Sequence, residues 1–503
     1  MTEVRRPWHK AGSGYHAPLT SLPPAQLSRR ATIGGGLATL TGACGLAACS
    51  TDPSPEEARA LARNTNTELA KLINGETELV VGGERLDVGL LQRFYARHDF
   101  EPVWTSRPEQ AKALVDAVLQ ADDHGLDADR FYASLLRHRS RLPPIKRDLV
   151  LSDAFLSYAD ALARGAVPVE RRGENETLTP APVDVPDVLD GAMDSSDPGA
   201  EIEALAPRTA TYAGLRHALR QYRSDGPSAA PSRLRTIEVN LERQRWLPRQ
   251  LPADRAWVNA ADQGLVLYRS DQPAIAMRVV VGQDGATNQT PEFHALIEAV
   301  VFNPPWRIPD DIAQREIMPI LDRDPNYLKR NDIVTLPDGG LEQRPGPDAG
   351  LGLLMFNMPN RFDVYLHDTP DKYLFNRDNR RVSHGCIRVQ HPRDLASLLM
   401  GEPMEAINEA IATGATNQRE LPSPVPVFVV YQTAFVDTDG ELQFRPDFYN
   451  RDARIWQNLH RRPNRASEAN DRPTPSGPSG GAGALDKAVP QASLKSAVRT
   501  RGA

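Results

Sequence analysis

Hydrophobic residues in the first half of the chain recur at spacings of three and four positions. This period is that of amphipathic α-helices, and it predicts a helical domain over 57–223. The residues that share such faces are Leu114, Val115, Val118 and Leu119, then Leu151, Phe155, Tyr158 and Leu162, then Tyr212, Leu215, Leu219 and Tyr222. An acidic, Pro-rich stretch at 171–208 breaks the pattern and is expected to be a loop.

The spacing of the hydrophobic residues becomes shorter after a Ser/Pro/Gly-rich linker at 224–234. Short apolar or alternating runs separated by turn residues predict strands, and hence a mainly-β domain over 235–455. These runs are 255–260, 264–268, 275–281, 294–302, 351–356, 362–367, 425–436 and 442–444. One helix is expected at 391–400. The fold class is therefore α+β: a helical domain, then a mainly-β domain.

A Pro-rich insertion at 304–350 interrupts the predicted strands, with a helix expected near 310–320. Long insertions in compact domains are commonly functional loops, so this one is a candidate lid.

The N-terminal segment 1–48 has the charge and hydrophobicity pattern of an export signal. Arg29-Arg30 resembles a twin-arginine signal, although a general secretory signal has the same charges. Leu46-Ala47-Ala48-Cys49 resembles a lipoprotein signal, in which Cys49 is lipidated and begins the mature chain. The alternative is a short core helix with a chance cysteine. The Pro/Ser linker at 49–56 favours the signal.

The chain has three cysteines: Cys44, Cys49 and Cys386. Signal cleavage and lipidation would leave Cys386 as a single free thiol in an oxidising compartment. Residues 1–48 hold five Lys/Arg and one Asp/Glu, so the formal charge changes from −6 to about −10 on cleavage. The chain therefore lacks the overall positive charge that would favour nucleic-acid binding. The tail at 463–503 is rich in Pro, Gly, Ser and Ala and is expected to be disordered.

The candidate chemistry lies around Cys386. A cysteine nucleophile needs thiolate character and a nearby base. His384 and Arg388 lie close enough in sequence to lower the thiol pKa, and the helix expected after Cys386 would favour the thiolate. The amides of Gly385 and Cys386 are candidate oxyanion donors. His367 ends a predicted strand and is the candidate base.

Two other interpretations of these residues remain open. Cys386 could be a structural thiol, although His, Gly and Arg surround it in the sequence. His367, His384 and Cys386 could form a three-ligand zinc site. The cationic Arg388 beside these residues argues against a metal ion.

His367, the spacing of fifteen residues between it and Ser383, and Ser383-His384-Gly385-Cys386 resemble the active-site signature of the L,D-transpeptidase catalytic domain. Further similar segments indicate the large branch with an N-terminal helical scaffold domain. These segments are 94–95, 102–104, 303–306, 343–347 and 365–370.

The chain departs from the family pattern in two ways. Many members have Asn two residues after the cysteine, where this chain has Arg388. The branch also often carries a small peptidoglycan-binding module before the catalytic domain. Only 221–234 separates the last predicted scaffold helix from the first catalytic segment, so that module is expected to be absent and wall affinity must come from elsewhere.

The resemblance implies a two-step acyl transfer on peptidoglycan stem peptides. Cys386 would attack the third stem residue and release D-Ala, and the resulting thioester would pass to a neighbouring amine, giving a 3–3 cross-link. His367 would act as base, oriented by Asp368 or a nearby carbonyl. Tyr365, Ser383 and Arg388 would contact substrate, and no metal or organic cofactor is needed.

Two other functions remain open at this stage. Water could accept the same thioester, which would make the protein an L,D-carboxypeptidase. It could instead be an inactive wall-binding lipoprotein, although the Cys/His pair argues against this. Ser50 after the lipidated cysteine favours the outer membrane, facing the periplasm.

Overall fold

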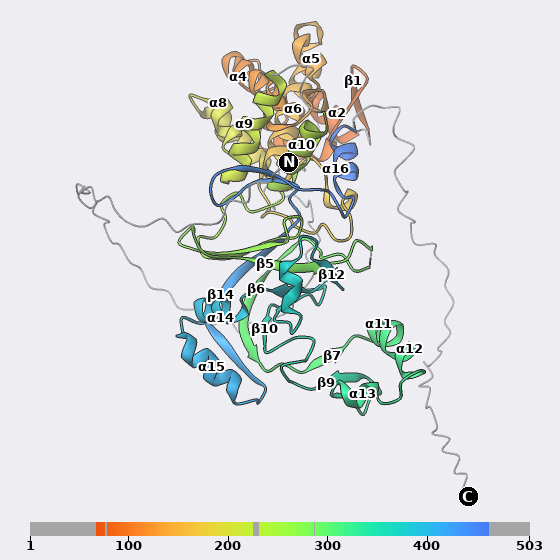
Figure 1. Cartoon of the computed structure of the whole chain (residues 1–503). Coiled ribbons are helices and arrows are strands. Elements are labelled where there is room, and N and C mark those ends of the chain that lie inside the picture. The colour runs from red at the N-terminus through yellow and green to blue at the C-terminus, as the bar shows by residue number, and fades with distance from the viewer. Residues whose placement is uncertain (1–66, 76–77, 225–230, 286, 462–503) are drawn as a thin grey trace, which may run out of the picture. The chain divides into compact units, whose positions relative to one another are not determined.

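The computed structural model describes residues 67–75, 78–224, 231–285 and 287–461 (Figure 1). The expected export signal, the lipidation residue Cys49, the linker at 49–56 and the tail at 463–503 lie outside these ranges. Within them, no helix combines the length and the apolar character needed to cross a membrane.

The first part of the described chain is helical, as predicted. Its central helix, α6 (Pro144–Arg164), starts with a proline in its first turn, where no backbone donor is lost. The predicted faces of α4, α6 and α9 are confirmed, because their apolar residues lie in one hydrophobic core. The other elements are α2 (Glu68–Gly75), β1 (Leu79–Val81), β2 (Glu84–Leu86), α3 (Val88–Ala96), α4 (Pro108–Leu119), α5 (Ala133–Arg137), α9 (Ala210–Ser224) and the 3₁₀ turns η1 (Ala121–His124), η2 (Ala128–Phe131), η3 (Arg139–Arg141) and η4 (Val169–Arg171).

The segment 171–208 is not the loop that its composition predicts. It forms α7 (Val185–Asp194) and α8 (Pro198–Glu203), which bury Leu189 and Ile202. Each helix has a proline in its first turn, and the side chain of Asp197 accepts a hydrogen bond from the Ala200 amide at the start of α8. The prolines therefore begin helices here instead of interrupting them.

The change from helical to β structure also comes later than the predicted boundary at 235. Helix α10 (Pro231–Arg245) runs through that position and contributes Ile237 and Leu241 to the helical core. Its polar sequence is deceptive because its charges are buried in pairs: Glu242 contacts Arg245 at 2.8 Å, and neither is exposed to solvent.

Nine strands form the main sheet of the second part, in the order β12-β5-β13-β11-β10-β6-β14-β3-β4. Strand β5 also pairs with β4, so the sheet closes on itself. The strands are β3 (Arg255–Asn259), β4 (Gly264–Arg269), β5 (Gln272–Gly282), β6 (Phe293–Phe302), β10 (Leu354–Asn357), β11 (Leu366–His367), β12 (Arg381–Ser383), β13 (Ile387–Val389) and β14 (Asn417–Val430). The mainly-β prediction is confirmed.

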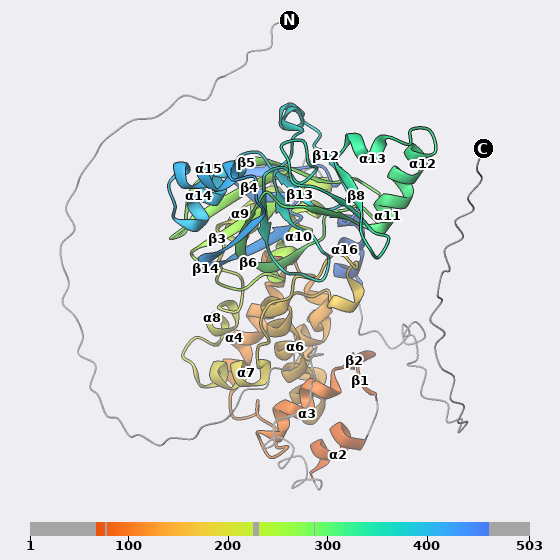
Figure 2. The ribbon, with the colours of Figure 1, turned by 90° about the horizontal axis from the view of Figure 1, so that it is seen from below.

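Two helices, α14 (Pro392–Met400) and α15 (Met404–Ala412), complete the β core through residues such as Leu395 and Ile407. In Figures 1 and 2 they lie together on one side of the sheet. The chain then returns to the helical core. The hairpin β15 (Ala434–Val436) and β16 (Leu442–Phe444) contributes Ala434, and α16 (Asp452–Leu459) contributes Leu459. The predicted end of the catalytic domain at 455 therefore falls inside a helix of the other core.

The insertion at 304–350 is a small unit with its own hydrophobic core. Its three strands, in the order β7-β9-β8, are β7 (Trp306–Ile308), β8 (Ile333–Thr335) and β9 (Leu341–Gln343). The helix expected near 310–320 is present as α11 (Asp310–Ile312), the π-helical turn η6 (Ala313–Ile317) and α12 (Met318–Leu321), followed by α13 (Tyr327–Arg330). Figures 1 and 2 both show these helices on the side of the sheet away from α14 and α15.

Candidate active site

Strands β11 and β13 bring the two candidate catalytic residues to neighbouring strands. They pair in parallel, with Leu366 opposite Ile387 and His367 opposite Arg388. Because side chains alternate along a strand, Leu366 and Ile387 enter the core, where both are fully buried, and His367 and Arg388 take the other face. Cys386, two residues before Arg388, lies on the same side as His367.

His367 is a buried and neutral imidazole. Burial, together with the charge of Arg388, lowers its pKa from 6.5 to about 4, although the backbone carbonyls of Asp368 and Leu351 act in the opposite direction. Its Nδ1 lies 2.6 Å from the Asp368 carbonyl oxygen. A carbonyl can only accept, so Nδ1 carries the proton and Nε2 is left as the basic nitrogen.

The Asp368 carboxylate does not orient the imidazole. It accepts hydrogen bonds from the amides of Thr369 and Leu353, at 2.7 and 3.0 Å, and forms an ion pair with Lys372. Of the two orienting groups that the sequence left open, the structure places the backbone carbonyl against His367.

The Cys386 thiol is also uncharged at rest. Burial raises its pKa above the ordinary value and outweighs the Tyr365 backbone amide and the Arg388 guanidinium, which lower it. Cys386 is followed directly by β13, and α14 begins only at Pro392. The expected activation by a helix dipole is therefore wrong, because a strand stands between the thiol and the helix.

The structure does not bring the thiol and the imidazole into hydrogen-bond contact. Sγ lies 3.8 Å from the Asp363 carbonyl oxygen, and the His367 ring faces the Asp368 carbonyl. Catalytic hydrogen bonds are often long without substrate and shorten when it binds. The pair is thus placed on one face of adjacent strands, ready for approach.

The turn before Cys386 is fixed from inside. Gly385 has φ +119°, a region that favours glycine. Its carbonyl accepts a hydrogen bond of 2.8 Å from the buried Thr290 hydroxyl, and its amide donates to Ser383 Oγ over 3.2 Å. The Ser383 hydroxyl in turn donates to the Cys386 carbonyl over 2.6 Å.

These bonds change two expectations. Ser383 is buried and braces the turn, so its hydroxyl is not directed at substrate. The Gly385 amide is already engaged by Ser383, whereas the Cys386 amide donates to none of the described residues. Of the two expected oxyanion donors, only the Cys386 amide is free in the resting site.

His384 and Arg388 have acidic partners. His384 Nε2 lies 2.6 Å from Glu316 Oε1, which comes from the insertion, and Arg388 lies 3.1 Å from Asp371. His384 is thus a contact to the insertion, and it does not contribute to the thiol pKa. The Arg388 Nε is buried and has no hydrogen-bond partner among the described residues, whereas the side chain as a whole is partly exposed.

Tyr365 lies next to Cys386, on the continuation of the strand pairing, where the Ile387 amide donates to the Tyr365 carbonyl over 2.9 Å. Burial raises the pKa of its phenol, and the negative charge of Asp363 adds to this. Tyr365 is half-buried, so it remains a candidate for substrate contact.

Sequence reasoning missed Thr290 and Glu316. Both come from segments far from the motif, and nothing in their local sequence marks them. The zinc alternative finds no support in the geometry: among the described residues, no three His, Cys, Asp or Glu side chains are grouped as a metal would require.

Comparison with known proteins agrees with this site. A scaffold-domain model matches residues 89–219, and an L,D-transpeptidase catalytic-domain model matches residues 253–429, which include His367 and Cys386. The chain thus matches an L,D-transpeptidase catalytic domain preceded by a scaffold domain, as the sequence predicted.

The individual relatives and solved structures share low sequence identity with this chain. A candidate L,D-transpeptidase of Haemophilus influenzae is 26% identical over 417 residues, covering 77% of this chain and 83% of the relative. An Enterococcus faecium L,D-transpeptidase mutant matches 36% of this chain and 50% of its own at 14% identity, with a TM-score of 0.17. L,D-transpeptidase 1 of Mycobacterium tuberculosis matches 35% of this chain and 61% of its own at 12% identity, with a TM-score of 0.16.

Proposed function

We propose that the protein is a peptidoglycan L,D-transpeptidase that forms 3–3 cross-links through a thioester on Cys386. The observation that carries this proposal is the placement of Cys386 beside a buried, neutral His367, inside the segment that matches the catalytic-domain model. A neutral imidazole with Nδ1 bound to a carbonyl is prepared to accept a proton at Nε2.

In the acylation step, Cys386 Sγ attacks the carbonyl carbon of the third stem residue, diaminopimelate by analogy with the family. His367 Nε2 takes the thiol proton, and the Cys386 amide donates to the oxyanion. When the tetrahedral intermediate collapses, the bond to the terminal D-Ala breaks. His367 passes its proton to the departing amine, which leaves the thioester on Cys386.

In the transfer step, the side-chain amine of a second diaminopimelate attacks the thioester carbonyl. His367 takes a proton from that amine, the new amide bond forms, and the Cys386 thiolate leaves and regains its proton. Water in place of the amine would give the L,D-carboxypeptidase product, a tripeptide stem. The two reactions therefore differ only in the acceptor.

Arg388 and the insertion supply substrate binding in this proposal. The guanidinium of Arg388, partly exposed and beside both catalytic residues, suits a carboxylate of the stem peptide. The insertion reaches the turn before Cys386 through the pair between His384 and Glu316. Closure of the insertion over bound peptide would exclude water and favour the amine acceptor.

We also propose that the protein is a lipoprotein of the cell envelope, anchored through Cys49 and facing the periplasm, with the outer membrane favoured. The support is the sequence of the N-terminal segment alone. Cys49→Ser should release an active protein from membranes. Retention of a correctly cleaved Cys49→Ser protein through high-salt and carbonate washing would contradict the anchor.

Product analysis on purified tetrapeptide muropeptides tests the activity. Wild-type protein should give 3–3 cross-linked dimers with release of D-Ala, and intact-protein mass spectrometry should detect an acyl adduct. Cys386→Ala should give neither product nor adduct while keeping the wild-type melting temperature. Substantial cross-linking by Cys386→Ala would exclude the mechanism, and tripeptide without dimer would assign the carboxypeptidase activity instead.

A further inference from the structure

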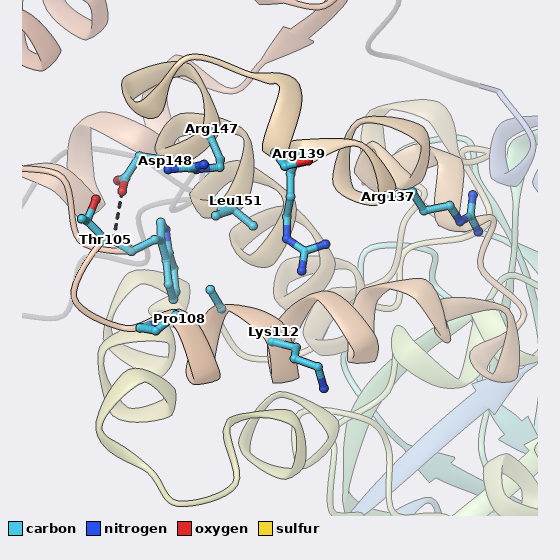
Figure 3. Close-up of a pocket in the computed structure, with 11 residues that line it drawn as sticks. Thr105, Pro108, Lys112, Arg137, Arg139, Arg147, Asp148 and Leu151 are labelled. Atoms are coloured by element: carbon cyan, nitrogen blue, oxygen red, sulfur yellow. Dashed lines mark hydrogen bonds between the residues drawn. The ribbon is translucent and has the colours of Figure 1, made fainter.

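A cavity of about 470 Å³ lies in the helical part of the protein, apart from the catalytic strands (Figure 3). Helix α4 forms one side of it through Pro108 and Lys112, and α6 forms another through Arg147 and Leu151. Arg139, on the turn η3, completes the wall. Its size lies within the range of small-molecule sites, about 300–1,000 Å³.

The charge of this cavity is strongly positive. Four cations line it, namely Lys112, Arg137, Arg139 and Arg147, against the single acid Asp148. The mature chain is acidic as a whole, so a concentration of cations here needs an explanation. Lys112 has a weak surface contact with Asp116 at 3.5 Å. Among the described residues, the three arginines form no ion pair.

Asp148 supplies one negative charge against these four cations, and its oxygens are held by other groups. They accept hydrogen bonds from the amides of Val103 and Trp104, at 3.1 and 2.9 Å, and from the Tyr95 hydroxyl at 2.6 Å. Burial raises the pKa of Asp148, and the charge of Arg147 acts in the opposite direction. The positive charge of the cavity is therefore available to a ligand.

Figure 3 shows how the cations are arranged. Arg139 extends into the space between α6 and α4, and Arg147 lies on the side of Asp148. Arg137 and Lys112 point outward from the rim. Arg139 also donates to the Leu136 carbonyl over 2.9 Å, which steadies its guanidinium and leaves other donors free.

The floor of the cavity is buried and rigid. Trp104 and Leu151 line it as almost fully buried residues, 4% and 3% exposed. Trp104 is held at both ends, because its backbone amide donates to Asp148 and its indole Nε1 donates to Ser152 over 2.8 Å. A preformed wall costs little ordering energy when a ligand binds. The cavity thus has a fixed, buried floor beside two half-buried guanidinium groups.

We propose that this cavity binds a stem peptide of the wall through its carboxylates. Arg139 and Arg147 would hold the carboxylates through charge-assisted hydrogen bonds. The ligand identity rests on the proposed function. The site would provide the wall affinity for which the sequence shows no separate binding module, and it would hold one strand while Cys386 reacts elsewhere.

Binding of a soluble disaccharide-tetrapeptide to full-length Cys386→Ala protein, measured by calorimetry, tests this site without turnover. Adding Arg139→Gln and Arg147→Gln should weaken the scaffold-site binding at least about tenfold, as expected for the loss of charge-assisted hydrogen bonds. Arg141→Gln is the matched control, since Arg141 lies on the same turn but does not line the cavity. Arg139→Gln alone keeps the test valid if Arg147→Gln lowers the melting temperature.

The supporting result is a salt-sensitive binding event lost in Arg139→Gln, retained in Arg141→Gln and absent with the disaccharide alone. Unchanged binding in Arg139→Gln overturns the proposal, and so does preferential binding of phosphatidylglycerol vesicles over the muropeptide. Acyl-adduct formation by the Arg139→Gln protein with native Cys386 is measured separately. An adduct without scaffold-site binding refutes only the cavity, whereas the absence of an adduct in wild-type protein refutes the proposed function.

Discussion

The buried imidazole of His367 makes the stability of the catalytic part depend on pH in a calculable way. Folding lowers the pKa of His367 from 6.5 to about 4, with burial as the main cause. Between these values the unfolded chain binds a proton that the folded chain does not. This contribution to stability is therefore complete above pH 6.5 and decreases as the pH falls toward 4.

The size of the effect follows from the shift. The full difference corresponds to about 3 kcal/mol, of which about 2 kcal/mol is lost between about pH 7 and about pH 5. His367→Gln removes the titration and keeps a neutral donor for the Asp368 carbonyl. The variant should therefore lack this loss, although other buried carboxyl groups still titrate in both proteins.

The test is urea unfolding of wild type and variant at the two pH values. Pulsed hydrogen exchange in peptides that cover β11 and β13 gives the unfolding free energy of these strands in each case. Reading these strands directly separates the β core from the helical core. The control is His391→Gln, at an exposed histidine in the same part of the chain, which should behave as wild type. An equal pH dependence in wild type and His367→Gln would refute the burial argument.

Four further predictions concern the surroundings of Cys386. Gly385→Ala should cost about 1–3 kcal/mol, because φ +119° is strained for alanine, and should reduce adduct formation; an unchanged melting temperature would contradict this. Glu316→Ala should raise KM with less than about 1 kcal/mol change in stability, whereas Asp322→Ala, on the same insertion, should change neither. Arg388→Gln should raise KM about tenfold or more, and equal KM values would exclude a carboxylate contact. Exhaustive chelation should leave turnover unchanged, and recovery of lost activity on adding zinc would favour a metal site.

The parts of the fold that the sequence predicts are those in which apolar residues follow a simple period. The faces of α4, α6 and α9 and the strands of the closed sheet belong to this class. Helix α10 does not, because Glu242 and Arg245 neutralise each other in the interior and no period of apolar residues reveals that burial. Pairing of buried charges is a tertiary property, so the domain boundary was misplaced.

The candidate site divides in the same way. Cys386 and His367 can be identified from residue type and spacing, because the chemistry requires a thiol and a base. The brace from Thr290 and the contact from Glu316 come from segments about 70 to 95 residues away, and only the fold brings them near. The sequence also could not predict that the pKa of Cys386 is raised. Neighbouring cations, which lower this pKa, can be identified in the sequence, whereas the burial that raises it cannot.

That sign has a consequence for how the proposed enzyme works. A thiol whose pKa is raised and an imidazole whose pKa is lowered form a neutral pair at rest, not a thiolate–imidazolium ion pair. Thiolate is the form that oxidants attack, so the resting pair protects Cys386 in a protein proposed to act in an oxidising compartment. The thiolate must then arise during attack on substrate, when His367 Nε2 accepts the proton and Arg388 lies close to both residues. The same burial that makes Cys386 weakly acidic thus makes its activation depend on bound substrate.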